Sequence, residues 1–490
     1  MTTFVQPKRV THPPTHASDG TAPAGAAITP EMLASLRRDF QSKPSYQLAQ
    51  NAVTQVTIDD VALNRSVVTA TDHTFSHLLD DWTVTHQKKS GRCWMFAGLN
   101  LFRVGAMKKM NLKDFEFSQN YTLFWDKFER SNYFLEAIID TAAGVGRAGG
   151  MAGAGGAGEV GGRDVDDRTV AFLLDRPLED GGQWNMFVNI VKKHGLVPKS
   201  AMPETQSSSD TQKMNGVLLH KLREGAKTLR DLRQHGAPME ALRSAKLEIL
   251  QVIHRILCIH LGTPPAKFDW QWNDKDKAFH RDGEMTPQQF AHKYVELKLD
   301  EYVCLVNDPR KSSPYNRTFT VEYLGNVVGG DRVIYLNVHM DVMKQIAMRT
   351  IMDGEPVWFG CDVGKMMRRD MGLWDKNLYD FDTLYDTTFN MSKADRLIHH
   401  QTLMTHAMLF TGVDVAHEPP RPRRWRVENS WGDDCTGKKG FFVMNDSWFD
   451  EHMFEIAAKK SMLTPELIKA LDEEPIVLPA WDPMGALARG

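Results

Sequence analysis

The stretch QKKSGRCWMFAGLN, residues 87–100, places Cys93 directly after a Ser-Gly-Arg tripeptide and at the start of a run with helical apolar spacing. Apolar residues three and four positions apart continue to Val104, so a helix is predicted to begin near Cys93. The free N–H groups and the positive dipole end of such a helix favour the thiolate form of a cysteine. The stretch therefore allows two interpretations of Cys93, a small buried hydrophobic residue or a nucleophile.

A cysteine nucleophile requires a group that accepts and returns its proton, and a histidine in that role must be held in one tautomer. His406 opens the strand-like run HAMLFTGV, and Asn429 lies near the end of the strand-like run RWRVENSW, close to Trp431. An asparagine there can present its amide to the imidazole while the indole excludes water from that bond. Gln87 lies on the loop before the predicted helix, where its amide and the Cys93 N–H could bind the oxyanion of a tetrahedral intermediate. A core histidine and a turn asparagine are the alternative interpretations.

Together these residues resemble the signature of the papain-like cysteine peptidases. The lines QKKSGRCW, HAML and ENSWG are similar to those of the intracellular bleomycin hydrolase and aminopeptidase C family, over about residues 48–490. The resemblance implies Cys93 as nucleophile, His406 as general acid/base, Asn429 as the residue that orients the histidine, Gln87 in the oxyanion hole, and Trp431 and Trp94 in supporting roles. Further matching segments are DGGQWNMFVNIVKKHGLVPK (180–199), FGCDVG (359–364), MNDSWFDEHMFEIAAKK (444–460) and PAWDPMGALA (479–488).

Two features distinguish the chain from the secreted papain relatives. Position 90 is a serine, where those enzymes have a cysteine that enters a disulfide, and Cys93 and His406 lie much farther apart in the sequence. Helical insertions would account for the extra length. The Gly/Ala-rich insertion and the long N-terminal arm depart from the family pattern without touching a motif.

The resemblance and the order of helix-like and strand-like segments both indicate an α+β protein with a papain-like two-lobed fold and helical insertions. A helical lobe would carry Cys93, and a β-rich lobe would carry His406 and Asn429. The expected segments are a disordered N-terminal arm (1–29), the helical lobe (30–205) with a flexible Gly/Ala insertion (143–162), a helical insertion (206–300), the β-rich lobe (301–447), and a C-terminal helix followed by a tail that occupies the cleft (448–490).

Local signals set several helix and strand boundaries. Thr29 before Pro30 is typical of a helix start, as is Thr286 before Pro287, and Ser118 is a candidate cap for helices over 117–140. Two apolar faces are predicted in the helical insertion, one with Val217, Leu218 and Leu222, the other with Leu242, Leu247, Leu250, Ile253 and Leu257. Six runs after residue 300 have the composition of an antiparallel sheet or a barrel-like half: TFTVEYLG, RVIYLNV, PVWFGCDV, HAMLFTGVDV, RWRVENSW and KGFFVMN.

The composition is that of a globular protein without a net basic field, since the 490 residues carry a formal charge of -3. Nucleic acid is therefore not expected as the main partner, and without a long apolar run no membrane helix is expected. Five cysteines, an odd and low number, argue against a disulfide framework and favour a reducing compartment. A cytoplasmic location is predicted, although Lys8 and Arg9 in an arm with one acid leave mitochondrial import open. His399 and His400 lack further ligands at metal spacing, so neither a metal nor a cofactor is expected.

The C-terminal segment EPIVLPAWDPMGALARG contains three prolines, which favour an extended chain, and it ends in small residues. The resemblance implies that this tail lies in the active-site cleft, where its carboxylate meets the α-amino group of the substrate and selects chain ends. It also implies that Arg489 and Gly490 are removed by self-cleavage, which leaves Ala488 last. An ordinary packed terminal segment is the alternative.

The expected function is that of a cysteine aminopeptidase, which removes N-terminal residues from small peptides and peptide-like amides through an acyl-thioester. Bleomycin and homocysteine thiolactone are substrates that the resemblance suggests, and it also implies a homohexamer. The competing hypotheses are acyl transfer to amines and a non-catalytic peptide- or nucleic-acid-binding homo-oligomeric assembly.

Overall fold

The computed structural model describes most of the chain as two units. The arm 1–29 and the insertion 143–162 lie almost entirely outside the described residues, so their flexibility stays a prediction. The smaller unit comprises residues 27–62 and 381–387, and the larger unit comprises the rest. The described ranges are 27–79, 82–143, 162–416, 418–434 and 437–488.

The smaller unit consists of short helices with little buried surface. Helix α1 begins as predicted, because Pro30 occupies its first turn and the Thr29 side chain accepts a hydrogen bond from the Met32 N–H. Asp386 accepts hydrogen bonds from Lys43 (2.5 Å) and Tyr46 (2.8 Å). No residue of α1 or α2 is buried, so both helices expose their apolar side chains. The helices are α1 (Pro30–Ser42), α2 (Pro44–Val53), α3 (Ile58–Ala62) and α14 (Phe381–Tyr385).

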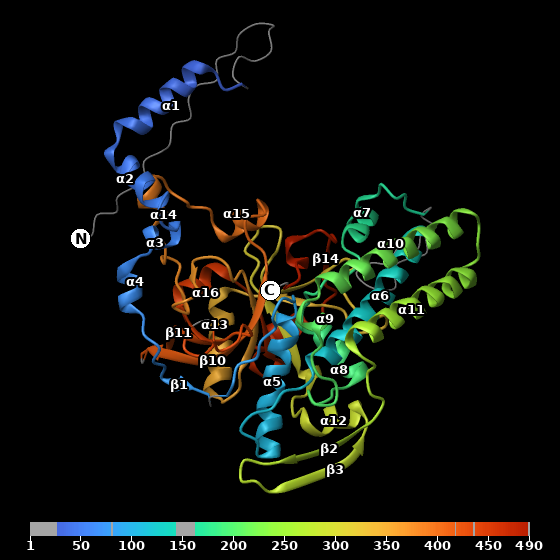
Figure 1. The fold of residues 1–490 in the computed structure, drawn as a ribbon. Coiled ribbons are helices and arrows are strands. Elements are labelled where there is room, and N and C mark those ends of the chain that lie inside the picture. Colours follow the sequence, from blue (N-terminus) through green and yellow to red (C-terminus); the bar gives the residue numbers. More distant parts are fainter. Residues whose placement is uncertain (1–26, 80–81, 144–161, 417, 435–436, 489–490) are drawn as a thin grey trace. The chain divides into compact units, whose positions relative to one another are not determined.

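In the described part of the larger unit, twelve strands form one sheet (Figure 1). Their order is β14-β5-β6-β4-β13-β7-β10-β11-β12-β9-β8, and β1 pairs with β10. The predicted antiparallel sheet is in fact mixed, because the pairs β14–β5, β4–β6 and β12–β9 are parallel. Each of the six predicted runs overlaps a strand. The strands are β1 (His77–Leu78), β4 (Tyr302–Val306), β5 (Arg317–Val321), β6 (Tyr335–Asn337), β7 (Val357–Cys361), β8 (Met367–Arg368), β9 (Leu373–Trp374), β10 (His406–Ala416), β11 (Arg421–Glu428), β12 (Phe441–Asn445), β13 (Met453–Lys459) and β14 (Ile476–Leu478).

Strand β13 corrects the expectation for the C-terminal segment 448–490. It lies in the middle of the sheet between β4 and β7, whereas a helix followed by a tail was predicted there. Nearly all of its residues are buried, so it lacks the alternation that marks a half-exposed strand and resembles a buried helix in sequence. The helix before it, α16 (Asp446–His452), is short and ends where the strand begins.

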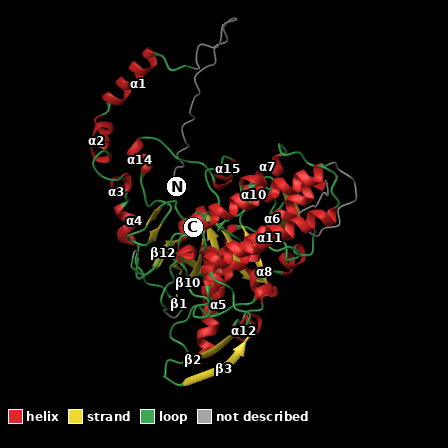
Figure 2. Ribbon diagram, turned by 45° about the vertical axis from the view of Figure 1, so that its right-hand side comes forward, coloured by secondary structure: helices red, strands yellow, loops and turns green. Residues whose placement is uncertain are grey.

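Helix α5 (Cys93–Met110) is the buried centre of the larger unit. It packs against β7 and β10 of the sheet and against α6 and α8 on the helical side. The long helices α10 and α11 in turn pack against α6 (Figure 2). The segment 117–140 forms the single helix α6, with the Ser118 hydroxyl accepting a hydrogen bond from the Tyr121 N–H at its start. The bounds are α6 (Gln119–Ala143), α8 (Trp184–His194), α10 (Gln212–Gln234) and α11 (Met239–Leu261).

The predicted apolar faces of α10 and α11 are buried with two exceptions. Leu218, Leu222 and the other predicted leucines and isoleucine are buried, but Val217 and Leu247 are 49% and 58% exposed. Each of these two lies roughly 100° around its helix from the centre of the buried stripe, at 3.6 residues per turn. The prediction is therefore wrong for Val217 and Leu247.

The segment 206–300 also contains a β-hairpin, so the expectation that it is wholly helical is wrong. Trp270 on the first hairpin strand packs against Phe115 and Phe290 at ring-centroid distances of 6.1 and 5.4 Å. Alternating aromatic residues in FDWQWN are the signal for this strand. The helix that follows has the predicted start, with a capping box between Thr286 and Gln289. The elements are β2 (Phe268–Asn273), β3 (Phe279–Met285) and α12 (Pro287–Tyr294).

The remaining elements are short, apart from α13, which packs on the sheet. They are α4 (Arg65–Ala70), α7 (Arg168–Asp175), α9 (Gln206–Ser209), α13 (Met340–Met352), α15 (Lys393–Ile398), α17 (Pro465–Ala470), and the 3₁₀ turns Leu299–Glu301, Lys460–Met462 and Pro483–Gly485.

The tight packing of α5 predicts opposite effects for two glycine substitutions. A Cβ at Gly98 would lie 2.4 Å from the buried ring of Phe187, whereas a Cβ at Gly216 of α10 would meet no atom within 4 Å. We expect G98A to lower the free energy of unfolding by about 1–3 kcal/mol through overpacking. G216A should raise it by about 0.5–1 kcal/mol, because alanine favours a helix over glycine. Denaturant titration of G98A, G216A and wild type measures the three free energies of unfolding. A change of the same sign and size in both variants would contradict the prediction.

A buried carboxyl on β13 predicts how stability changes with pH. Glu455 is 1% exposed, and burial raises its pKa to about 7, an effect that a hydrogen bond with the Cys304 thiol opposes. In the unfolded chain this carboxyl ionises near pH 4.5. The wild-type protein therefore loses stability as the pH rises from 4.5 to 7. Because an amide does not titrate, E455Q should gain stability over wild type across that window, reaching about 3 kcal/mol above pH 7. Denaturant titration at pH 5, 6.5 and 8 measures the difference in unfolding free energy between E455Q and wild type. A difference that does not change with pH would contradict the prediction.

Candidate active site

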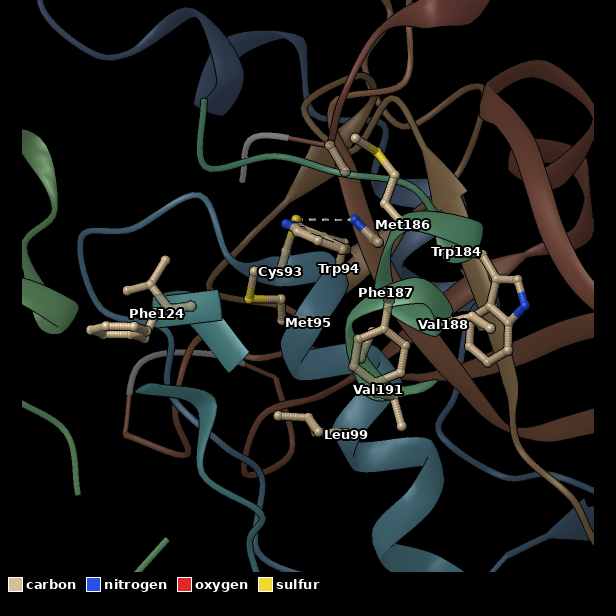
Figure 3. Close-up of a cluster of buried hydrophobic side chains, with 14 of the residues drawn as sticks. Cys93, Trp94, Met95, Leu99, Phe124, Trp184, Met186, Phe187, Val188 and Val191 are labelled. Carbon is tan, nitrogen blue, oxygen red and sulfur yellow. Dashed lines mark hydrogen bonds between the residues drawn. The ribbon is translucent and has the colours of Figure 1, made fainter. Parts of the chain in front are cut away.

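Cys93 is the first residue of α5 and is completely buried at the junction of that helix with the sheet. Its sulfur accepts a hydrogen bond from the Ala407 N–H at 3.4 Å, which is the bond drawn as a dashed line in Figure 3. Trp184 and Phe187 of α8 belong to the same buried cluster and lie beside this part of the helix (Figure 3). The sulfur therefore lies beside the backbone at the start of β10, more than 300 residues away in sequence.

His406 is the first residue of β10, and Asn429 directly follows β11. The two strands are hydrogen-bonded neighbours, and they bring the His406 Nε2 within 2.9 Å of the Asn429 Oδ1. Both side chains are fully buried. Because the amide oxygen accepts, Nε2 carries the hydrogen, and Nδ1 has no hydrogen-bond partner among the described residues. The imidazole thus has one fixed nitrogen and one nitrogen that can accept a proton.

Burial sets the charge state of this imidazole. It lowers the pKa of His406 to about 4, and the hydrogen bond with Asn429 acts in the opposite direction. The ring is therefore neutral at physiological pH and can act as a base toward a neighbouring thiol.

A second thiol lies next to His406, but its environment disfavours ionisation. Cys361 pairs with His406 across the β7–β10 ladder and is completely buried. Burial, together with the charges of Asp362 and Cys93, raises the pKa of the Cys361 thiol well above its usual value. Of these two thiols, only that of Cys93 lies at a helix N-terminus, where the dipole favours a thiolate.

Two tryptophans predicted to support the site make different contacts. The Trp431 ring lies 5.1 Å from the His406 ring, centroid to centroid, and the Arg369 guanidinium lies 4.7 Å from the Trp431 ring. This places an indole over the imidazole, where it can exclude water. Trp94 is fully buried, and its indole nitrogen donates a 2.7 Å hydrogen bond to the Asp180 carbonyl oxygen.

Gln87 lies on the loop that leads into α5 and is almost fully buried. Its backbone N–H donates to the Ser430 carbonyl at 2.8 Å, and its side-chain nitrogen donates to the Ser90 carbonyl at 2.7 Å. The bond to Ser90 uses one hydrogen of the side-chain amide nitrogen, which leaves the second hydrogen available to donate to another acceptor. These two bonds hold Gln87 between Ser90, three residues before Cys93, and Ser430, the residue that follows Asn429.

The same loop is fixed by a buried ion pair that sequence analysis did not find. The Arg92 side chain, fully buried, makes two hydrogen bonds of 2.9 and 2.7 Å to the Glu204 carboxylate. The Arg92 Nε also donates to the Ser90 hydroxyl at 2.8 Å, which in turn donates to the Gln87 carbonyl at 2.6 Å. Serine at position 90 is thus part of a polar chain that ends at Gln87.

A buried carboxylate joins the two elements that carry Cys93 and Asn429. Glu428, directly before Asn429, is 2% exposed and accepts hydrogen bonds from Asn100 (2.9 Å) and Arg103 (2.7 Å) of α5. It also accepts a 2.7 Å bond from the Trp82 indole. Burial raises the pKa of Glu428, and the charge of Arg103 opposes that shift. The sequence signal for this contact is the pair of polar residues Asn100 and Arg103, which interrupt the apolar run after Cys93.

The C-terminal tail lies against the segment that follows Asp180. Ala488 is completely buried and pairs with Gly182 in an antiparallel bridge, and the Gln183 side chain donates to the Ala486 carbonyl at 2.6 Å. Upstream, Asp482 forms two hydrogen bonds of 2.8 and 3.1 Å with Arg310. The described part of the tail is therefore a packed, paired segment that reaches Gly182, which lies beside the Trp94 ring.

Within the described ranges, no three His, Cys, Asp or Glu side chains are grouped so as to bind a metal ion. None of the helices in those ranges is both long and apolar enough to span a bilayer. Among the described cysteines, Cys258, Cys304 and Cys361 are free thiols.

Comparison with known proteins gives consistent results along nearly the whole chain. The model of the Peptidase C1-like family matches residues 27–485. Bleomycin hydrolase of Rattus norvegicus is 43% identical over 469 residues, which cover 94% of this chain and 99% of the relative. Aminopeptidase C of Listeria monocytogenes is 41% identical over 461 residues, which cover 94% of this chain and 99% of the relative. The crystal structure of PepW from Lactobacillus rhamnosis superimposes with a TM-score of 0.88 at 45% sequence identity. The match covers 94% of this chain and 100% of the PepW chain.

The matched family and the full-length similarity agree with the fold, an α+β architecture of papain type in which helix α5 packs on the sheet that carries His406 and Asn429. The chain belongs to the Peptidase C1-like family of cysteine peptidases.

Proposed function

We propose that the chain is a cysteine aminopeptidase that acts on small peptides and peptide-like amides through Cys93, His406 and Asn429. The observation that carries the proposal is the convergence of three segments, the start of α5, the start of β10 and the end of β11, on one buried point. Relatives named aminopeptidase C and bleomycin hydrolase, more than 40% identical over nearly their whole length, support this activity.

In the proposed reaction the neutral His406 takes the Cys93 proton on Nδ1, and the thiolate attacks the carbonyl carbon of the first peptide bond. The Cys93 N–H and the Gln87 amide would donate hydrogen bonds to the oxyanion, each worth about 2.7–4 kcal/mol of barrier. The imidazolium then protonates the leaving amine, and an acyl-thioester remains on Cys93. Water, deprotonated by His406, releases the N-terminal residue and restores the thiol.

Selection of chain ends would come from the tail. A chain that ends at Ala488 would place a carboxylate beside Gly182, where it could pair with the α-amino group of a substrate. The buried, paired tail would also exclude the internal segments of longer chains. Bleomycin and homocysteine thiolactone remain candidate substrates, the first from the names of relatives and the second from its activated acyl group.

This assignment predicts a dependence on a free amino terminus. Aminoacyl fluorogenic amides should be hydrolysed about 10–100-fold faster than their N-acetylated forms, because acetylation removes one charge-assisted hydrogen bond. C93A should lose several orders of magnitude in kcat for both. Initial rates over a concentration series test this. The folding control is E136Q, which changes a partly buried ion pair with Lys246 outside the proposed catalytic residues. Equal rates for free and blocked substrates would reject the aminopeptidase assignment.

We also propose a homohexameric, cytoplasmic enzyme. Helix α1 supports self-association, since Met32, Leu33, Leu36 and Phe40 are 39–61% exposed along it and none of its residues is buried. The free thiols of Cys258, Cys304 and Cys361 are compatible with a reducing compartment. The removal of Arg489 and Gly490 by the enzyme itself is part of the same proposal.

Mass spectrometry tests both assembly and processing. Under native conditions we expect a particle of six chains, and under denaturing conditions a chain that ends at Ala488. C93A should assemble equally but retain Gly490, because processing would need the nucleophile. A monomeric native mass would overturn the hexamer, and identical chain masses ending at Gly490 in both proteins would overturn self-cleavage.

A further inference from the structure

Asp180 contacts residues on both sides of the nucleophile. The Gly91 N–H, two residues before Cys93, donates to the Asp180 carboxylate at 3.1 Å. The indole of Trp94, one residue after Cys93, donates to the Asp180 carbonyl oxygen at 2.7 Å. Any shift of Asp180 relative to α5 would break one or both of these bonds.

The carboxylate is itself held rigidly by two helices. Lys127 of α6, whose side chain is 0% exposed, donates to it at 2.5 Å and also donates to the Glu179 carbonyl at 2.7 Å. Asn215 of α10 donates at 2.7 Å, and the Thr211 hydroxyl donates from just before that helix. Burial alone would raise the pKa of Asp180, but the charge and hydrogen bond of Lys127 hold it well below the usual range. Asp180 is therefore ionised at neutral pH, and both of its carboxylate oxygens accept hydrogen bonds.

The three residues after Asp180 hold the tail. Gly182 pairs with Ala488, and Gln183 donates to the Ala486 carbonyl. A Cβ at Gly181 would lie 2.4 Å from the Ala488 oxygen, and one at Gly182 would lie 2.5 Å from the Trp94 ring. The short segment 180–183 thus contacts the neighbours of Cys93 at one end and the last described residues of the chain at the other.

We infer that Asp180 is a positioning residue that fixes the register between the tail and Cys93, and that this register limits the released fragment to one residue. The inference rests on the proposed aminopeptidase function. Successive residues of an extended peptide are about 3.3 Å apart. A tail that retreats by that distance would leave room for a second substrate residue before the cleaved bond, so that dipeptides would be released.

The test compares D180N with wild type on a free-amine tetrapeptide and reads the first products by chromatography and mass spectrometry. Asparagine has nearly the same size but leaves the buried Lys127 without its carboxylate partner. We expect a tenfold or larger rise in the ratio of dipeptide to single-residue product. The rate of single-residue release should fall about 10–100-fold. E136Q likewise removes the carboxylate partner of a lysine, Lys246, which makes no hydrogen bond to Asp180, and it should keep the wild-type ratio.

A milder variant and a double variant separate positioning from simple loss of stability. T211V removes one donor to Asp180 without changing charge, and it should shift the product ratio in the same direction by a smaller factor. A chain truncated after Asp482 keeps the bond to Arg310 but lacks the paired tail residues, so it should release dipeptides, and D180N should add no further shift to it.

The outcomes distinguish this inference from the function on which it rests. If D180N and T211V fold and both keep the wild-type ratio while truncation changes it, Asp180 does not set the register and the inference fails alone. The inference also fails if D180N shifts the ratio equally in the truncated chain, since it would then act without the tail. An unmodified enzyme that releases no N-terminal residue would overturn the proposed function and this inference together.

Discussion

The arrangement of the site depends on one buried carboxylate, that of Glu428. It accepts hydrogen bonds from two side chains of α5 and immediately precedes Asn429 on the sheet. The helix that carries the sulfur and the strand that carries the orienting amide are thereby joined in the core, away from solvent. Removing one partner of a buried, hydrogen-bonded ion pair typically costs about 3–5 kcal/mol. The geometry around His406 therefore depends on a contact that takes no part in the chemistry.

Burial also decides which groups around the sulfur are charged. The neutral imidazole of His406 and the suppressed ionisation of Cys361 have the same cause, the absence of water. Cys93 differs because it begins a helix, whose unpaired N–H groups can compensate for the lost hydration of a thiolate. The carboxylates of Glu428 and Asp180, in contrast, are paired with cations that lie on neighbouring helices.

The sequence was most informative where a signal is local. The start of α5, the caps at Thr29 and Thr286 and the six strand runs follow from short-range spacing and cap chemistry, and the structure confirms them. The contact between His406 and Asn429 was suggested by their places at the ends of strand-like runs, but only the resemblance to a family favoured it over a core histidine and a turn asparagine. Strand β13 was missed because a fully buried strand carries no alternation. The pairs Arg92–Glu204 and Arg103–Glu428 were missed because each joins residues more than 100 positions apart, which no periodicity reveals.

The packed tail has a consequence for thiol-directed inhibitors of such an enzyme. The backbone at Gly182 is already paired with the last described residue of the tail, Ala488, which is wholly buried there. A long peptidyl electrophile would have to displace a segment anchored by the Arg310–Asp482 pair before its reactive carbon reached the sulfur. A compact electrophile with one side chain would not have to displace this segment. Selective reagents would thus be small, in contrast to the extended inhibitors that suit an open cleft.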